Sequence, residues 1–472
     1  MSNLDSDVII VGGGLAGLAC AVGLAEQEIK AVVLESRPRL GGRATSINDP
    51  TTGEEIDNCQ HVAMGCCVNF LDFCQRVGID DCFVRESSLT FVDKAGNHSR
   101  ISANPFLPAP LNLAGAFGRA KFLTAKDKIV LARGLMSLYH ANPRDYQNFA
   151  EFLDRHHQTP GTIRGYWEPV LVSALSESME RIDFRAGRKV FVDGFLSHVD
   201  AWPIWLAKKP LGWIYGERIV GWLKAKGVDV RMSSGVEQVD VVDNHVKQVR
   251  LRSGDLISAK QIVVAVPWFN IHRVLSEEVL STIVPNVHQF EAAPISSVHL
   301  WYDQPITPLR HAVLLERVSQ WLFNRTAILE EKSPGRFAYQ VVISQSRELL
   351  SRPQSEIAGL VDRELREAFR VDDSTTLLHS RVITEHKAVF SPLTSTERFR
   401  PTQKTSIKGL YLAGDWTQTG WPATMEGAVI SGYRAAEELL SAQGRRESIV
   451  QPEFKTRWWT RAMLAAGRVL GR

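Results

Sequence analysis

VIIVGGGLAG, residues 8–17, carries the strongest structural signal in this 472-residue chain. Its four apolar residues predict a buried strand, and the apolar run that follows the glycines predicts a helix. The GxGxxG spacing allows a tight turn, close approach of a phosphate to the backbone, and close packing of helix on strand. Because a helix N-terminus also offers unpaired N–H groups to an anion, this stretch predicts a nucleotide pyrophosphate site. We expect cofactor contacts from Gly12, Gly14, Leu15, Ala16 and Gly17.

A second predicted strand, residues 31–34, ends in Glu35, which lies 23 residues after Gly12. An acidic side chain at this point can accept hydrogen bonds from a ribose. Strand, glycine turn, helix, strand and acid in this order predict a dinucleotide-binding βαβ unit, with Glu35 at the ribose.

The segment that follows, ESRPRLGGR at residues 35–43, favours FAD as the dinucleotide. It resembles the ExxxxxGGR segment of the amine oxidase and phytoene desaturase superfamily of flavoproteins. Two consecutive glycines let the chain pass close to the cofactor, and Arg43 can neutralise a pyrophosphate through charge-assisted hydrogen bonds. The resemblance implies FAD contacts from Ser36, Arg37, Gly42 and Arg43.

The other half of the expected FAD site lies near the C-terminus. GLYLAGD, residues 409–415, predicts a buried strand that ends in a glycine–acid turn, followed by a helix that extends through Ala436. Pro422 suits the first turn of that helix, where its missing N–H costs no hydrogen bond. In the resembled superfamily the glycine–acid element contacts the FAD phosphate and ribityl chain, and the helix N-terminus points at the isoalloxazine ring. This implies FAD contacts from Gly414, Asp415, Thr424 and Met425, and substrate contacts beside the ring from Trp416 and Trp421.

The positions of these motifs predict one interleaved α/β fold. It combines a Rossmann-like FAD-binding domain of the GR2 type with an α+β substrate-binding domain. In the resembled superfamily a hairpin such as the one predicted from Val236 returns the chain to the first domain, which implies that Val236 meets the adenosine. The expected boundaries are 1–85, 221–290 and 396–445 for the FAD-binding domain, 86–220 and 291–395 for the substrate-binding domain, and 446–472 for a basic amphipathic tail.

Composition restricts the partners of the chain. With 44% hydrophobic and 23% charged residues it is an ordinary globular sequence, and a net charge of +3 does not indicate nucleic-acid binding. The six cysteines contain no CxxC pair, so we expect no metal site. We also expect a reduced, cytoplasmic protein. No cleavable signal is expected at the N-terminus. No second strand–GxGxxG–helix unit exists for NAD(P)H, so electrons must be exchanged with an external partner, a quinone or oxygen, which the sequence does not identify.

The segment DNCQHVAMG, residues 57–65, narrows the reaction. It resembles a D-x-G-Q-H-x-x-x-G stretch of the squalene-associated branch of the superfamily, the hydroxysqualene dehydroxylases. Residues 414–429 and 192–196 (VDGFL) also resemble that branch. The resemblance implies reductive loss of the allylic hydroxyl of hydroxysqualene, a C30 isoprenoid, to give squalene, with hydride supplied by reduced FAD. Such a site needs an acid, an apolar slot and little bulk water.

The same segment supplies the candidate catalytic residues. His61 is the first candidate for the proton donor, since an ordinary histidine titrates near neutral pH; a histidine that packs and holds the loop is the alternative. Asp57 is expected to orient His61 or bind a flavin hydroxyl, and Gln60 to hydrogen-bond nearby. Cys59 stands where the family pattern has glycine, so it either adopts a negative φ or shifts the loop. Two interpretations of Cys59 are open: a redox-active thiol, and a buried, inert cysteine.

Two stretches are candidates for peripheral contact with the inner face of the cell membrane. Residues 454–472 contain five basic residues and no acid, with apolar residues at helical spacing, which predicts an interfacial amphipathic helix or a terminal helix docked on the protein. Residues 105–122 predict either a lid at a substrate entrance or a plain apolar loop and buried helix.

Three other functions share parts of this pattern. A carotenoid desaturase of the phytoene type would remove hydride from an isoprenoid in the same slot. A flavin amine oxidase would place an aromatic cage around a small amine, which this sequence does not show convincingly. A non-enzymatic isoprenoid carrier would lack the flavin motifs that are intact here.

Overall fold

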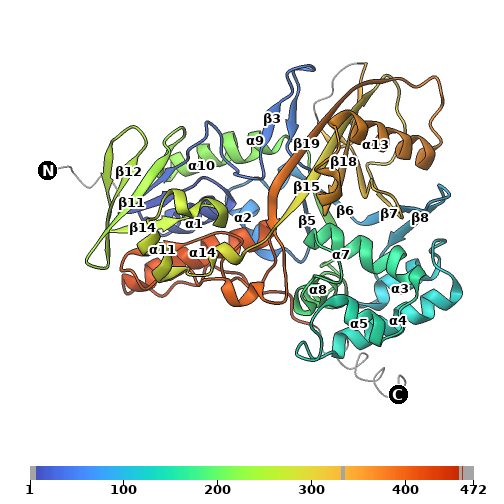
Figure 1. The fold of residues 1–472 in the computed structure, drawn as a ribbon, viewed down its shortest axis with the longest axis horizontal. Helices are drawn as coiled ribbons and strands as arrows, with labels where there is room; N and C mark the ends of the chain where they lie inside the picture. The colour runs from blue at the N-terminus through green and yellow to red at the C-terminus, as the bar shows by residue number, and fades with distance from the viewer. Residues whose placement is uncertain (1–6, 331–334, 457–459, 461–472) are drawn as a thin grey trace.

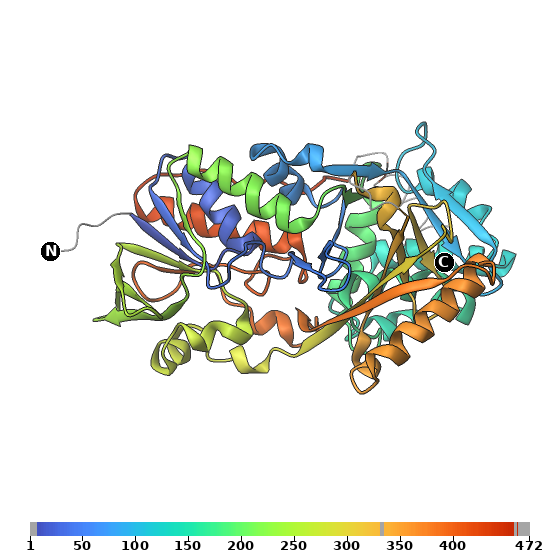
Figure 2. The ribbon, with the colours of Figure 1, turned by 90° about the horizontal axis from the view of Figure 1, so that it is seen from above.

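The computed structural model describes residues 7–330, 335–456 and 460, which form two lobes side by side (Figures 1 and 2). One lobe contains the N-terminal strand, and the other contains the middle of the chain. Two long strands, β15 (Ala292–Tyr302) and β19 (Leu377–Phe390), extend from the junction of the lobes into the second one. They pair antiparallel along most of their length.

The first lobe is built on a five-stranded parallel sheet in the order β10-β2-β1-β14-β20. Its central strand β1 pairs in parallel with β2 on one side and β14 on the other, so that Val8 lies opposite both Ala31 and Gln261. The sheet takes strands from all three segments that were expected to form the FAD-binding domain, and the predicted Rossmann-like architecture is confirmed. The strands are β1 (Val8–Val11), β2 (Ala31–Leu34), β10 (Asp229–Arg231), β14 (Gln261–Val264) and β20 (Leu410–Leu412).

Helices cover one face of this sheet. Every residue of α1 (Leu15–Ala25) is buried, because it lies between the sheet and α14 (Met425–Ala442). A Cβ at Gly432 would lie 2.2 Å from the carbonyl oxygen of Ala16, so only glycine permits the two helices to approach this closely. The neighbouring helices are α2 (Val68–Arg76), α9 (Leu211–Trp213) and α10 (Ile219–Ala225).

The start of α14 corrects one expectation. Thr424 is the N-cap of this helix, and its hydroxyl accepts a hydrogen bond from the N–H of Gly427 at 3.1 Å. Pro422 therefore precedes the helix, and its predicted place in the first turn is wrong. A threonine cap satisfies one of the unpaired N–H groups of the first turn, which fixes the helix start at Met425.

A small antiparallel sheet and short helices pack against the other face of the parallel sheet. The packed residues include Ile9, Val239 and Ile262, which belong to one buried cluster. The elements are β11 (Val236–Val242), β12 (His245–Leu251), β13 (Leu256–Ser258) and α11 (Glu277–Ile283).

The second lobe contains a seven-stranded sheet in the order β19-β15-β18-β17-β16-β7-β8. Strands β7 and β8 form an antiparallel hairpin, and β7 joins the sheet by pairing in parallel with β16. Helix α13 (Gln354–Phe369) covers one face of the sheet. The remaining strands are β7 (Ser88–Val92), β8 (His98–Ser102), β16 (His311–Leu314), β17 (Trp321–Asn324) and β18 (Phe337–Ser344).

A layer of helices covers the other face of this sheet, and the two enclose a core rich in aromatic residues. Two short π-helical turns, η2 (Ile163–Trp167) and η3 (Val192–Leu196), interrupt this layer. The helices are α3 (Leu111–Gly118), α4 (Ala125–His140), α5 (Phe149–Arg155), α6 (Pro160–Thr162), α7 (Glu168–Leu175) and α8 (Phe184–Phe191).

Short strands connect the lobes. Strand β9 (Ile204–Ala207) pairs with β5 (Val62–Met64) and β6 (Phe83–Glu86), and β3 (Ser46–Asn48) pairs with β4 (Glu55–Asp57). The candidate segment 57–65 thus lies at the boundary between the lobes. Among the helices of the described residues, none has the length and apolar character needed to cross a membrane.

Candidate cofactor and substrate site

A cavity of about 760 Å³ extends from the glycine motif of the first lobe into the second lobe. Nearly all of the predicted site residues line it, although they come from both ends and the middle of the chain. The exceptions are Gly17, which packs under the turn, and Asp57, which lies behind the wall.

The N-terminus of α1 forms one end of the cavity. Gly12 has φ of 111°, a conformation that favours glycine, and a Cβ at Gly17 would lie 2.0 Å from the carbonyl oxygen of Gly12. Gly14 is the N-cap residue of α1, and it has no side chain with which to cap the helix. The first turn of α1 contains no acidic residue. A Cβ at Gly14 would meet nothing closer than 3.8 Å, so the space beside it is open to a ligand. An anion can therefore reach the helix N–H groups.

Glu35 is fixed at the end of β2 with its carboxylate on the cavity wall. One oxygen accepts the N–H of Gly13 at 2.8 Å, and the other accepts the N–H of Arg37 at 2.8 Å and the hydroxyl of Ser36 at 3.1 Å. A carboxylate held in this way retains lone pairs for a ribose hydroxyl. Val236, the first residue of β11, lines the same part of the cavity.

An ion pair joins the two halves of the predicted FAD site. The guanidinium of Arg43 contacts the carboxylate of Asp415 at 2.6 Å and donates to the carbonyl of Ala388 at 2.7 Å. Gly414 has φ of 143°, and its N–H donates to the hydroxyl of Ser431 on α14 at 2.8 Å. The glycine–acid turn is thereby placed beside the ExxxxxGGR segment.

Arg400, which sequence reasoning missed, holds this turn from behind. Its buried guanidinium donates to the carbonyl oxygens of Thr417 and Asp415. Burial lowers the pKa of Arg400, while Glu397 opposes that shift.

The residues of this part of the cavity fit a dinucleotide. They combine an uncapped helix N-terminus for the pyrophosphate, an acid for the ribose, and several guanidinium groups for the phosphate charge. The cationic side chains on the wall are Arg37, Arg43, Arg252 and Arg273.

Asp57 supports the 57–65 segment and does not face the cavity. Its fully enclosed carboxylate contacts the guanidinium of Arg325 at 2.8 Å and accepts the hydroxyl of Ser46 and the N–H of Leu211, each at 2.8 Å. Arg325 also donates to the side-chain oxygen of Gln60. Sequence reasoning missed Arg325, which follows an apolar strand and carried no recognisable motif.

His61 lines the cavity with its imidazole. Its Nδ1 lies 2.9 Å from the carbonyl oxygen of Cys59, so Nδ1 carries the hydrogen and Nε2 is left as an acceptor when the ring is neutral. Burial lowers the pKa of His61, and Arg43 adds to that effect, although the Cys59 carbonyl and Asp57 oppose it. At neutral pH this ring is better suited to accept a proton than to donate one. Its catalytic role stays a prediction.

Cys59 lines the cavity beside His61, and its φ lies outside the left-handed region. The loop thus accommodates a side chain where the family pattern has glycine. Burial, followed by the charge of Asp57, raises the pKa of the Cys59 thiol to about 12. A protonated thiol is a weak nucleophile, which favours the inert alternative.

The two tryptophans differ in their surroundings. Trp416 is fully buried, donates its indole N–H to the carbonyl of Val266 at 3.0 Å, and packs edge-on against Phe290. Trp421 lies under the ammonium of Lys189, which is 4.4 Å from the ring centroid. Both reach the cavity wall, and their substrate contacts stay predictions.

The part of the cavity in the second lobe is an apolar slot. It lies between the sheet and the helical layer, where side chains from both contribute to its walls. We define the slot by Leu89, Phe91, Ile101, Leu113, Phe117, Val170, Trp202, Ile204, Val313, Trp321, Phe323 and Val342. Apart from Leu113 and Phe117, which belong to the candidate lid at residues 105–122, sequence reasoning placed none of these residues, because apolar residues of a core and of a slot have the same pattern.

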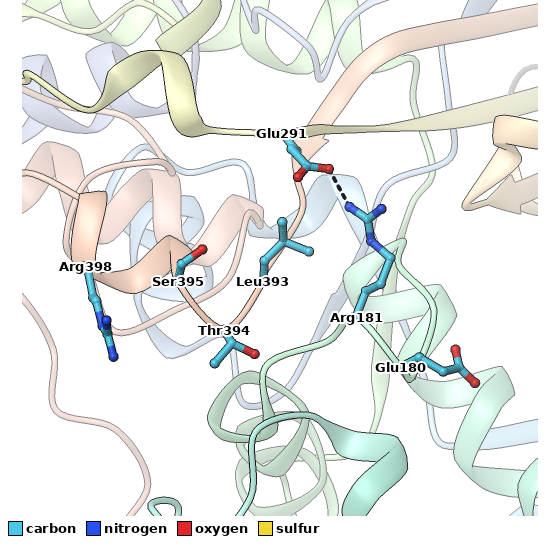
Figure 3. Close-up of a pocket in the computed structure, with 7 residues that line it drawn as sticks. All are labelled: Glu180, Arg181, Glu291, Leu393, Thr394, Ser395 and Arg398. Atoms are coloured by element: carbon cyan, nitrogen blue, oxygen red, sulfur yellow. Dashed lines mark hydrogen bonds and ion pairs between the residues drawn. The ribbon is translucent and has the colours of Figure 1, made fainter.

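A second depression lies on the surface where the chain returns to the first lobe (Figure 3). An ion pair between Arg181 and Glu291 crosses it, and Leu393 is one of its lining residues. It opens widely to solvent and none of the nucleotide-binding motifs reaches it, so we do not assign it to the site.

Comparisons with known proteins agree with this geometry. The sequence matches the family described as flavin containing amine oxidoreductase over residues 15–440, which is most of the chain. A 15-cis-phytoene desaturase of an Oncidium hybrid cultivar is 28% identical over 92% of this chain and 78% of its own length. A probable zeta-carotene desaturase of Synechococcus elongatus is 26% identical over 92% of this chain and 99% of its own length.

Solved structures share the fold at low sequence identity. A putrescine oxidase bound to putrescine superposes with a TM-score of 0.68 at 14% identity, over 92% of this chain and 99% of that one. Cyclohexylamine oxidase from Brevibacterium oxydans superposes with a TM-score of 0.64 at 17% identity, over 93% of this chain and 100% of that one. The chain belongs to the flavin-containing amine oxidoreductase family and is an FAD-dependent oxidoreductase.

Proposed function

We propose that this enzyme reduces hydroxysqualene to squalene, with loss of the hydroxyl as water. The observation that carries the proposal is the apolar slot, which continues directly from the FAD site and whose wall has few ionisable groups. A C30 hydrocarbon with one hydroxyl matches such a slot, because it offers apolar surface along its length and one group that needs a proton. The resemblance of residues 57–65 to the squalene-associated branch supports the same substrate.

The slot would bind the substrate through apolar contact and shape. Each CH₂ group removed from water contributes about 0.8 kcal/mol, so a long isoprenoid chain needs few hydrogen bonds for affinity. Side chains from both the sheet and the helical layer would exclude water from the reacting carbon. An allylic cation lives longer where water is absent, which favours reduction over simple hydration.

FAD, when bound and reduced, supplies the hydride that completes the reaction. The protein contributes the residues that would hold the cofactor and a helix dipole on the cavity wall. The Arg43–Asp415 pair and Glu35 would hold the cofactor, and the N-terminus of α14 at Thr424 and Met425 provides a positive dipole end on the cavity wall. This dipole would favour negative charge in that part of the site.

A carotenoid desaturase is the second candidate, and two observations favour it. The curated relatives described above carry desaturase names. The acceptor state of His61 would also suit removal of a proton from a substrate that has lost a hydride. In that reaction the same slot would hold a longer, oxidised isoprenoid.

Reduced holoenzyme is expected to convert hydroxysqualene to squalene. The enzyme is reduced with dithionite under nitrogen and mixed with hydroxysqualene in detergent micelles. The products are then identified by gas chromatography with mass spectrometry, and FAD oxidation is followed by absorbance. One squalene should form for each FAD oxidised.

A matched incubation uses oxidised holoenzyme and phytoene. A conjugated polyene in that incubation, together with no squalene in the first, would replace the proposal by desaturation. Apoprotein with the same reductant corrects for chemical reduction of the substrate.

Peripheral membrane contact forms part of the proposal, and the loop before α3 is its best-placed element. Phe106 is 92% exposed, and Leu107 and Leu111 are 40% and 42% exposed. Leu113 and Phe117, a few residues further along, line the slot. The loop would thus meet the lipid that contains the substrate close to where the slot lies.

The charge of the segment supports this orientation. Residues 104–126 contain no acidic residue, and Arg119, Lys121 and Lys126 are exposed. Basic residues around an apolar loop match an anionic lipid surface. The terminal helix was predicted for residues 454–472, of which 457–459 and 461–472 lie outside the described residues and 454–456 are not helical. The hydroxyl of Thr460 donates to the carbonyl of Ala109 in this loop at 2.9 Å.

The double variant Phe106→Asp/Leu107→Asp is expected to bind vesicles about 10²–10⁴-fold more weakly than the wild type. Two apolar side chains that no longer enter the lipid forfeit about 1.5–3 kcal/mol each at full burial. Binding is measured by sedimentation with vesicles that contain phosphatidylglycerol. Leu256→Asp, at an exposed position on β13 of the other lobe, is the matched control. Equal binding of the loop variant and the wild type would exclude this loop as the contact.

A further inference from the structure

An ion pair lies on the wall of the cavity, on the segment that resembles the squalene-associated branch at residues 192–196. The carboxylate of Asp193 contacts the ammonium of Lys189 at 2.6 Å, and both residues line the cavity. Asp193 belongs to the π-helical turn η3, which follows α8 directly. Such turns often place a side chain where a regular helix would not, and they are frequent at functional sites.

The pair lies where the two lobes meet. A Cβ on Gly194 would lie 3.3 Å from the terminal methyl of Met64, and Met64 follows His61 by three residues. On the other side, Lys189 covers the ring of Trp421, which belongs to the segment between Asp415 and Thr424. Asp193 is therefore close to both chain segments that are expected to border the reacting end of the substrate.

A chain of polar contacts leads from this pair to solvent. Lys189 also contacts the carboxylate of Glu453 at 2.8 Å, and the Glu453 side chain is 49% exposed. The same carboxylate accepts the indole N–H of Trp421 at 2.6 Å. Glu453, Lys189 and Asp193 thus connect bulk water to the cavity wall.

The other ionisable groups nearby are less suited to donate a proton. His61 is held as a neutral ring whose hydrogen already binds the Cys59 carbonyl. Burial raises the pKa of Glu426 to about 7, but both of its oxygens are already engaged, one with the N–H of Asn69 at 3.0 Å and the other with that of Phe70 at 2.7 Å. In the part of the chain that the structure describes, the Asp193 carboxylate contacts the ammonium of Lys189 through one oxygen, and Asp193 lines the cavity.

The surroundings of Asp193 favour its protonated form. Burial raises the pKa of Asp193, and Glu453 adds to that shift, whereas Lys189 and Arg188 oppose it. Cys66 also lies within electrostatic range of Asp193, and its contact with Cys67, followed by burial, raises the pKa of that thiol, so Cys66 adds no charge near neutral pH. The protonated acid is therefore better populated than for an exposed aspartate, and Lys189 stabilises the carboxylate after the proton leaves.

We propose that Asp193 is the catalytic acid that protonates the hydroxyl of the substrate, an inference that rests on the proposed dehydroxylation. The proton of the Asp193 carboxyl group is transferred to the allylic hydroxyl, the carbon–oxygen bond breaks, and water leaves. The allylic cation then accepts a hydride supplied by reduced FAD, which brings two electrons and gives squalene. The Asp193 carboxylate, paired with Lys189, regains its proton from solvent by way of Glu453.

Asp193→Asn is expected to slow single-turnover reduction of hydroxysqualene by about 10²–10⁴-fold, the usual contribution of a general acid. Reduced holoenzyme is mixed anaerobically with the substrate, and FAD oxidation and squalene formation are both followed. Asp200→Asn, a nearby and exposed aspartate that pairs with Arg85, is the control for loss of a carboxylate.

The pH dependence tests the same assignment without a substitution. The wild-type rate should fall as pH rises through the pKa of the donor, and Asp193→Glu should shift that fall while it keeps the acid. A rate that is flat between about pH 5 and 9 would overturn the assignment, as would an Asp193→Asn rate above one-tenth of the wild type. FAD absorbance and thermal unfolding of each variant establish that it is folded and loaded.

The two proposals fail in different ways. If wild-type enzyme forms no squalene, the dehydroxylation itself is rejected, and the role of Asp193 falls with it. If wild-type enzyme forms squalene and Asp193→Asn does so equally fast, only the assignment of the acid is rejected.

Discussion

The Arg325→Met variant is expected to lose about 3–5 kcal/mol of unfolding free energy, the usual cost of removing one partner of a buried ion pair. Arg325 is 5% exposed and contacts the fully enclosed carboxylate of Asp57. Methionine fills part of the space but leaves that carboxylate charged, buried and without its cation. Gln60 also loses a donor, so the loop that carries His61 should loosen.

Urea unfolding of the variant and the wild type measures this loss. The double variant Asp57→Asn/Arg325→Met should recover a large part of it, because no unpaired charge remains. Arg85→Met, which removes an exposed partner of Asp200, is the matched control and should cost about 0–1 kcal/mol. If Arg325→Met and Arg85→Met cost the same, the buried pair does not stabilise the fold in the way described.

Two glycine variants are expected to lose FAD for different reasons. Gly14→Ala should fold normally but bind FAD about 10–100-fold more weakly, because Gly14 already has φ of −76° and its Cβ would contact little of the protein. The methyl group would instead occupy the space that a pyrophosphate needs and remove charge-assisted hydrogen bonds worth about 1.5–3 kcal/mol each. Gly17→Ala should also destabilise the apoprotein by about 1–3 kcal/mol, since its Cβ would meet the carbonyl of Gly12.

Fluorescence titration of apoprotein with FAD, combined with thermal unfolding without FAD, separates the two effects. Gly221→Ala on α10 is the control, because its Cβ would meet nothing within 4 Å and alanine favours a helix by up to about 1 kcal/mol. Full FAD affinity of Gly14→Ala would mean that the phosphate does not lie at the N-terminus of α1.

The sequence predicted the FAD half of the molecule well because its signals are local. The glycine turn, Glu35 and the ExxxxxGGR segment each occupy a few consecutive residues whose spacing has a direct physical meaning. The helix start at Met425 was placed a few residues too early, because proline was given more weight than the threonine cap. Element boundaries depend on such competing caps, which short patterns resolve poorly.

The acid–base groups of the site were harder to predict, since they depend on contacts between distant segments. Asp57 appeared to be a reactive group beside His61, yet Arg325 engages it from a segment far along the chain. Asp193 carried a family resemblance but no visible chemistry until the fold placed Lys189 and Glu453 around it. Charge pairing across a fold leaves no pattern in a single sequence.

The order of strands in the parallel sheet has a consequence for biosynthesis. Strand β1 leaves the ribosome before β14, which must insert beside it; β20 must then pair with β14, and α14 must cover α1. The sheet around β1 therefore remains incomplete, with apolar surface exposed, until β20 and α14 have been translated. The cofactor site is complete only after that point, and a nascent chain interrupted before Met425 should depend on chaperones to avoid aggregation.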